Sequence, residues 1–247
     1  MNAIKASWLI CLRHQPDARL RLFCFPYAGG AAVAFRGWPE GLPASIEVWA
    51  IQPPGRGARL KETCYLRINP LIQDLFTAIV PFLDVPFAFF GHSLGALVAF
   101  ELTRILRRES SLLPARLFVS GCAAPQLLDH ELAVSKLPDD EFLERLRILD
   151  GTPPQVLENK ELLQVFLPTI RADYSVYESY AYAEENDLDT EISIYGGMQD
   201  KDVSLEQLEG WRSHTTAPAQ LKMFPGGHFF VQTSQALLLR SVAQDLI

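Results

Sequence analysis

Short apolar runs, separated by glycine, proline and polar clusters, recur along the chain. Six of these runs are rich in apolar and aromatic residues and predict strands, at 19–26, 45–52, 86–91, 115–121, 190–197 and 220–227. Longer segments with helical periodicity lie between or after them, at 69–83, 94–108, 137–149, roughly 158–182 and 229–247. Strands that alternate with helices indicate a mostly parallel sheet with helices on both faces.

One region breaks this alternation. Between the predicted strands 115–121 and 190–197 lie about seventy residues with no convincing strand, which is far longer than an ordinary loop. The helical periodicity inside this region predicts a helical insertion at about 125–186. It is either a lid or a helical insertion that only packs against the rest of the protein.

The pentapeptide Gly91-His92-Ser93-Leu94-Gly95 lies between an apolar strand and a helix. This pattern and context are typical of a nucleophile elbow, in which a strained turn exposes the serine hydroxyl above the sheet. The flanking positions must be small because strand and helix approach closely there. His92 is expected to pack behind the turn. The alternative is a tight strand–helix turn with a capping serine.

A serine nucleophile needs a base and an orienting acid, which follow it along the chain in this arrangement. Of the five histidines, His228 comes directly after the last predicted strand and is the expected base. Asp200 and Asp202 follow the strand at 190–197. We favour Asp200 because it is nearer to the strand end, although acids in such a loop also occur simply for solubility.

Backbone N–H groups are expected to stabilise a developing oxyanion near Ser93. The first is that of Leu94, at the start of a helix. The second comes from the segment FPYAGGAA at 25–32, where the N–H of Ala28 is the best candidate and glycines let the chain bend close to a ligand. A glycine-rich turn with no ligand is the alternative.

Composition and charge narrow the class of protein. The net charge is −7 and no cluster of lysine or arginine forms a basic stripe, which argues against nucleic acid as a partner. The four cysteines are scattered without a CxxC pair, so they predict free thiols in a reducing cytoplasm and no zinc site. The apolar segment WLICL is too short to span a bilayer. We therefore expect a cytoplasmic protein that does not enter a membrane, with no metal and no cofactor.

The chain resembles the stand-alone type II thioesterases of polyketide synthase and non-ribosomal peptide synthetase systems, a family that includes the medium-chain thioesterase of animal fatty acid synthesis. The similarity extends over nearly the whole chain and includes LFCFPYAGGAAVAFRGW, PPGRGARLKE, FFGHSLGALVAFEL, VSGCAAP, LPDDEFLERLRILDGTPPQVLEN, FLPTIRADYSVYESY, YGGMQDKDVSLEQLEGW and FPGGHFFV. It implies a single α/β-hydrolase domain over 1–247 with a lid at about 125–186. The family's functional residues then fall on Ser93, Asp200 and His228, with Ala28 and Leu94 as oxyanion donors.

The resemblance also implies hydrolysis of acyl groups from the phosphopantetheine arm of carrier proteins, by a monomer. Residues that could contact the acyl group are Tyr27, Gly29, Phe229 and a helical stripe of Phe166, Ile170, Tyr174 and Tyr177. That stripe could equally be internal packing of the insertion. Arg171 and Asp173, in the matched RAD segment, are interpreted as a helix-surface ion pair, and Cys122 as an inert small residue.

Other functions stay open on the sequence alone, among them an acyltransferase or cyclase, whose acceptor site the sequence does not reveal. A medium-chain fatty acyl thioesterase and a general carboxylesterase share the fold and chemistry, so fold alone does not separate them. An acyl-binding scaffold without activity is another, but it would have no need of all three triad residues.

Overall fold

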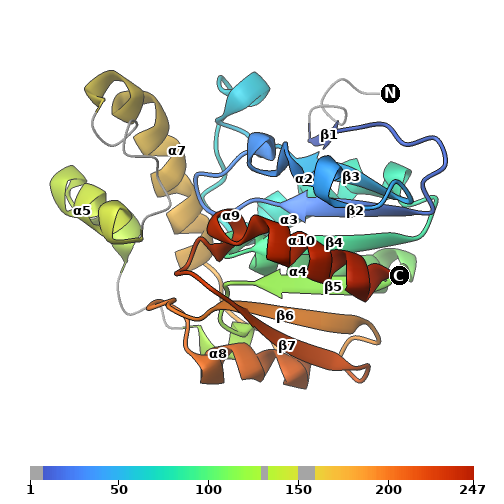
Figure 1. Ribbon diagram of the computed structural model, residues 1–247. Helices are drawn as coiled ribbons and strands as arrows, with labels where there is room; N and C mark the ends of the chain where they lie inside the picture. Colours follow the sequence, from blue (N-terminus) through green and yellow to red (C-terminus); the bar gives the residue numbers. More distant parts are fainter. Residues whose placement is uncertain (1–7, 129–132, 150–158) are drawn as a thin grey trace.

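The computed structural model describes residues 8–128, 133–149 and 159–247 (Figure 1). Its centre is a seven-stranded sheet in the order β1-β3-β2-β4-β5-β6-β7, parallel except for β1, which pairs antiparallel with β3. The strands are β1 (Leu9–Cys11), β2 (Leu20–Phe25), β3 (Ile46–Ile51), β4 (Phe87–His92), β5 (Arg116–Ser120), β6 (Glu191–Gly197) and β7 (Ala219–Phe224). The six predicted strands are thus confirmed.

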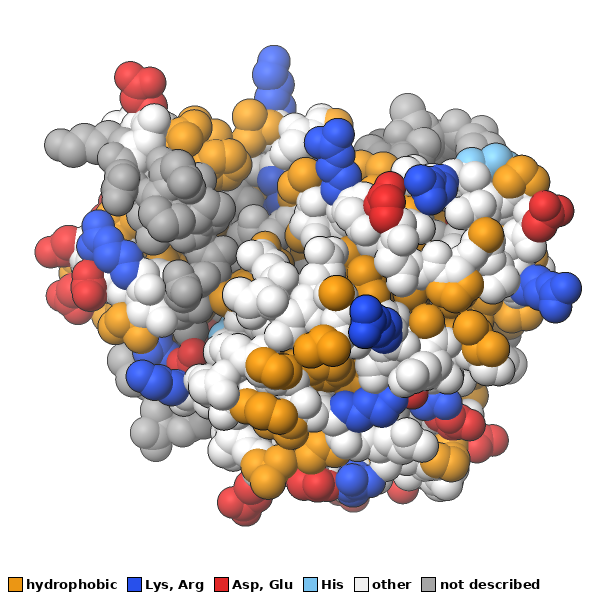
Figure 2. Space-filling model, viewed as in Figure 1, with side chains coloured by type: hydrophobic (Ala, Val, Ile, Leu, Met, Phe, Trp, Pro, Cys, Tyr) orange, Lys and Arg blue, Asp and Glu red, His pale blue; other side chains and the backbone are white. Residues whose placement is uncertain are grey.

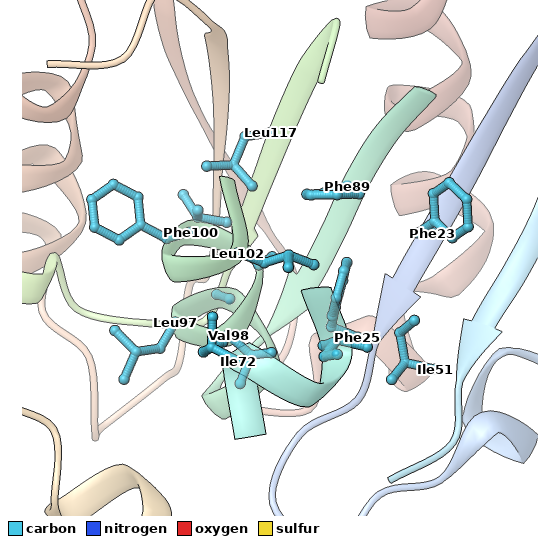
Figure 3. Packing of buried hydrophobic residues seen from close by; sticks show 14 of the residues in the cluster. Phe23, Phe25, Ile51, Ile72, Phe89, Leu97, Val98, Phe100, Leu102 and Leu117 are labelled. Carbon is cyan, nitrogen blue, oxygen red and sulfur yellow. The ribbon is translucent and has the colours of Figure 1, made fainter. Parts of the chain in front are cut away.

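Helices cover both faces of the sheet, which explains why its central strands are apolar throughout (Figure 1). Successive side chains of a strand point to opposite faces. In β4, Phe89 packs with α3 (Ile68–Ile79) and α4 (Leu94–Ser110) on one face, while Phe90 packs with α2 (Trp38–Gly41) and α10 (Gln235–Leu246) on the other. Figure 3 shows the first of these layers, where Leu102 of α4 points toward Phe25 and Phe89 of the sheet.

The sequence pattern missed the shortest elements and one break. Strand β1 has only three residues, too few to show a period, and α2 and α8 (Leu205–Glu209) are similarly short. The predicted last helix is divided into α9 (Phe230–Thr233) and α10, with the change at Ser234. The hydroxyl of Ser234 donates a hydrogen bond back to the carbonyl of Pro225, which ties the break to the loop after β7.

Among the described residues between β5 and β6 there are two α-helices, as the predicted insertion requires. Helices α5 (Asp139–Leu149) and α7 (Lys160–Glu178) stand to one side of the sheet in Figure 1 and share a small apolar cluster of Phe142, Leu146 and Ile170. Residues 129–132 and 150–158 lie outside the described residues. The second of these ranges includes the tripeptide Gly151-Thr152-Pro153, which is part of the resemblance to the family. Among the helices that are described, none is both long and apolar enough to cross a membrane.

Candidate active site

Ser93 lies at a sharp turn between β4 and α4. Its backbone has φ 54° and ψ −121°, a conformation that a non-glycine residue rarely adopts and that costs roughly 1–3 kcal/mol. The turn is held by the N–H of Ser93, which donates to the carbonyl of Ser120 at the end of β5 (2.8 Å). The surrounding sheet therefore fixes a strained serine at the carboxyl edge of its central strands.

The two glycines of the pentapeptide are required by the close approach of strand, turn and helix. A Cβ atom on Gly91 would lie 2.2 Å from the carbonyl oxygen of Gly95, and one on Gly95 would lie 2.1 Å from the carbonyl oxygen of Phe25. Both distances are far inside van der Waals contact with backbone atoms that cannot easily move. The prediction that these positions must be small is confirmed, and the start of α4 lies directly against the end of β2.

Asp200 and His228 are brought together from the loops after β6 and β7. The Nδ1 of His228 is 2.9 Å from Oδ2 of Asp200, and the two side chains are only 10% and 2% exposed. The other carboxylate oxygen of Asp200 accepts the N–H of Asp202 (2.9 Å). The side chain of Asp202 instead pairs with Arg145 of α5 (2.9 Å). Of the two acids left open by the sequence, Asp200 is the partner of His228.

His92 fills the space beneath His228. It is fully buried, its Nδ1 lies 3.0 Å from the hydroxyl oxygen of Ser120, and its ring centroid is 5.3 Å from that of His228. Burial, together with the proximity of His228, holds the pKa of His92 well below its ordinary value. His92 is therefore uncharged at neutral pH and acts as a packing residue.

Ala28 lies in the loop after β2, and this loop begins against the start of α4: a Cβ atom on Gly95 would lie 2.7 Å from the carbonyl oxygen of Pro26. The carbonyl of Tyr27 accepts a hydrogen bond from the N–H of Gly30 (2.8 Å). In a planar trans peptide the N–H of Ala28 points opposite to that carbonyl, and hence out of the turn. Leu94 is the first residue of α4, so its N–H has no acceptor within the helix. Two backbone donors thus come from segments that touch each other next to Ser93.

The predicted surface ion pair of Arg171 with Asp173 is wrong. Asp173 is buried, and its carboxylate accepts hydrogen bonds from both terminal nitrogens of Arg56, at 2.5 and 2.7 Å. Arg171 points elsewhere and binds the carbonyl oxygens of Ser135 and Leu137. Residues two apart on a helix lie on different faces, and that spacing was the signal that the two side chains have different partners.

The predicted acyl-contact residues fall into two groups. Tyr27 and Phe229 pack together near His228: their ring centroids are 4.9 Å apart, and Phe229 is 5.2 Å from the His228 ring. The residues of the helical stripe are mainly packed within the insertion, where Phe166, Ile170 and Tyr174 join the cluster shared with α5, whereas Tyr177 packs on the main core.

Cys122 is buried, and burial raises the pKa of its thiol to about 12. A thiol with such a pKa carries almost no thiolate at neutral pH. This supports its interpretation as an inert residue.

Two groups of potential metal ligands occur among the described residues. One is the Asp200, Asp202 and His228 set; the other comprises Cys11, His14 and Glu47 near the edge strand β1. The Glu47 carboxylate already accepts hydrogen bonds on both oxygens, from Trp49, Arg21, His14 and the N–H of Gln15. Hydrogen bonds therefore account for both arrangements.

A mostly parallel sheet carrying a strand–serine–helix elbow, with an acid after β6 and a histidine after β7, defines the α/β-hydrolase class. Within that class the chain belongs to the thioesterase family, whose thioesterase-domain model matches residues 20–246.

Similar proteins support this assignment along the whole chain. The linear gramicidin dehydrogenase LgrE of Brevibacillus parabrevis is 43% identical, over 98% of this chain and 93% of its own. The gramicidin S biosynthesis protein GrsT of Aneurinibacillus migulanus is 40% identical, over 97% of this chain and 94% of its own. The structure of the type II thioesterase BorB from the borrelidin biosynthetic cluster is similar with a TM-score of 0.90 and 34% identity, covering 98% of each chain.

Proposed function

We propose that the protein is a stand-alone type II thioesterase that hydrolyses acyl thioesters from the phosphopantetheine arm of carrier proteins in polyketide or non-ribosomal peptide synthesis. By doing so it removes stalled or aberrant acyl groups. One observation carries the proposal: the buried hydrogen bond between Asp200 and His228 lies at the same edge of the sheet as the strained Ser93, in a chain of the thioesterase family.

The reaction proceeds in two halves. Ser93 attacks the thioester carbonyl while His228 accepts its hydroxyl proton through Nε2, and Asp200 holds the imidazole ring and stabilises its positive charge. The N–H groups of Ala28 and Leu94 bind the oxyanion. The carbon–sulfur bond then breaks, and the leaving thiolate takes the proton from His228. In the second half His228 takes a proton from a water molecule that attacks the acyl carbon; the bond to Oγ of Ser93 then breaks, and His228 returns the proton to Oγ as the acid leaves.

The insertion at about 125–186 serves as a lid over this site, which is supported by the closeness of Ile170 of α7 to Gly29 in the loop that carries Ala28. Charge does not attract the usually acidic carrier domains over a distance, since the net charge of the chain is −7. Figure 2 shows basic and acidic side chains interspersed on the visible face, with apolar groups between them. Docking of a carrier therefore rests on local, transient contacts.

A dehydrogenase function, suggested by the name of one relative, has no support in this chain. Dinucleotide-binding proteins of this general architecture place a G-x-G-x-x-G turn and the start of a long helix after the first parallel strand. The sequence contains no G-x-G-x-x-G. Strand β2 leads instead into a 3₁₀ turn of four residues, Ala32–Phe35.

The substrate is tested with one acyl group presented on a carrier protein, on coenzyme A and on N-acetylcysteamine, beside the matching oxygen ester. We expect the highest kcat/KM for the acyl-carrier thioester. Equal or higher values for the small thioesters would show that the carrier is not recognised. A preference for the oxygen ester would indicate a carboxylesterase, and failure of a fluorophosphonate to label the protein would indicate an acyl-binding scaffold.

A further inference from the structure

We propose that the buried ion pair of Arg56 and Asp173 is a positioning device for the oxyanion loop, residues 26–31. Because the ion pair contacts both α7 and this loop, the oxyanion-binding site is correctly formed only when α7 is packed in place. This role rests on the proposed function, because the loop carries the N–H of Ala28 that would bind the oxyanion. Neither residue would touch the substrate.

The ion pair joins three segments that are distant in the sequence. Asp173 belongs to α7, Arg56 to the loop after β3, and the oxyanion loop follows β2. The Oδ2 of Asp173 accepts the N–H of Gly29 at 2.7 Å, and Nη1 of Arg56 donates to the carbonyl of Gly30 at 2.9 Å. Arg56 is only 3% exposed, and Asp173 only 6%. The ion pair therefore binds the loop backbone through two hydrogen bonds in a site shielded from water: Asp173 accepts one from the loop, and Arg56 donates one to it.

These contacts fix the peptide groups next to the oxyanion donor. The peptide that carries the N–H of Ala28 is oriented by the turn from Tyr27 to Gly30. The next peptide, between Ala28 and Gly29, is held by Asp173, and the carbonyl of Gly30 is held by Arg56. If the hydrogen bonds from Gly29 to Asp173 and from Arg56 to Gly30 are lost, the turn is free to rotate, and the direction of the Ala28 N–H is no longer fixed.

Packing couples the same loop to α7. Gly29 has φ +76°, and a Cβ atom there would lie 2.8 Å from Cγ1 of Ile170, so the helix presses directly on the loop. One residue earlier in α7, the hydroxyl of Thr169 donates to the carbonyl of Gly55, beside Arg56 (2.8 Å). Helix α7 thus supplies an apolar contact, a hydroxyl contact and a charge to the segments that shape the oxyanion loop.

Three variants separate positioning from simple stability. The double variant Arg56→Met/Asp173→Leu removes both charges at once, so no buried charge is left unpaired and the fold is expected to persist. Asp173→Asn keeps an oxygen that can accept the N–H of Gly29 but removes the charge opposite Arg56. Arg171→Met is the matched control, because it removes an arginine of the same helix whose partners lie within the insertion, at 135–139.

Each variant is compared with the native protein by its melting temperature, by kcat and KM for an acyl-carrier thioester, and by the Ki of an alkyl trifluoromethyl ketone. Such a ketone adds to the serine and places an oxyanion in the oxyanion site, so its affinity follows transition-state binding. We expect kcat of the double variant to fall about 30- to 100-fold, somewhat less than the loss of a whole oxyanion donor. The Ki should rise by a similar factor, while KM and the melting temperature change little. Arg171→Met should keep kcat and Ki close to native.

A folded double variant with native kcat and Ki would overturn the proposal and leave the ion pair a structural contact only. Should the double variant not fold, Asp173→Asn is used instead: loss of the charge opposite Arg56 should lower kcat and raise Ki, by less than in the double variant because the contact to Gly29 is kept, and native values of both would overturn the proposal. Ser93→Ala is assayed in parallel. If this variant hydrolyses the acyl-carrier thioester as fast as the native protein does, the proposed function is refuted, and the positioning role with it. Turnover that depends on Ser93 but not on the ion pair would refute the positioning role alone.

Discussion

Replacing Asp200 by asparagine tests the core of the proposed mechanism with the loss of a single charge. In the proposed mechanism, the carboxylate accepts the proton of His228 Nδ1, which lies 2.9 Å away, and Nε2 takes a proton from Ser93. An asparagine amide can present its NH₂ group to Nδ1 and so favour the opposite tautomer, with the proton on Nε2. The imidazolium that forms during the reaction would also lose its counter-charge.

The expected loss can be estimated from the structure. Two unit charges 2.9 Å apart at an effective dielectric constant of ~20 attract each other by about 6 kcal/mol. A rate loss on the order of 10⁴, as found for other triad acids, corresponds to about 5.5 kcal/mol of transition-state stabilisation. The two figures agree, so kcat for an acyl-carrier thioester should fall on the order of 10⁴-fold, with KM much less affected.

Asp202→Asn is the matched control. Its side chain pairs with Arg145, and both groups are partly exposed, so the expected effect on kcat is roughly tenfold or less. Both variants are assayed by carrier release under identical conditions, with thermal unfolding as a check of the fold. If Asp202→Asn were the more damaging change, or if Asp200→Asn kept near-native kcat, the assignment of the acid and of the tautomer would be refuted.

Three further predictions follow from other parts of the structure. Gly95→Ala should abolish activity and lower the melting temperature, because its Cβ would collide with the carbonyl oxygen of Phe25; native kinetics in this variant would show that the elbow is not so tightly packed. Burial, with a smaller contribution from Arg104, lowers the pKa of His214 from 6.5 to about 4, and the unfolded chain therefore binds a proton that the folded protein rejects. The free energy of unfolding should fall as the pH falls from 6.5 to 4, by up to about 3 kcal/mol from this group. Urea titrations over this pH range should show that His214→Phe removes this contribution. The same pH dependence in the variant as in the native protein would contradict this prediction. Cys122→Ser should keep native kcat, since the thiol is protonated at neutral pH, and a large loss would give that residue a role in the reaction.

The sequence pattern was sufficient for elements that show a period or a motif. The six longer strands follow from their apolar composition, and Gly91 and Gly95 mark the elbow because close packing leaves room for nothing larger. The choice between Asp200 and Asp202 needed the structure, since it depends on which way a short loop turns after β6. Arg56 and Asp173 are 117 residues apart, and no local pattern predicts a contact over that separation.

The most direct test of the central claim is to locate the acyl group during turnover. The protein is mixed with an acyl-loaded carrier, the reaction is quenched at short times, and the peptides are mapped by mass spectrometry. We expect the acyl mass on Ser93, appearing together with the free carrier thiol, and neither acyl-enzyme nor carrier release in Ser93→Ala. An acyl group on another residue, or release of the carrier by Ser93→Ala at the native rate, would contradict the account.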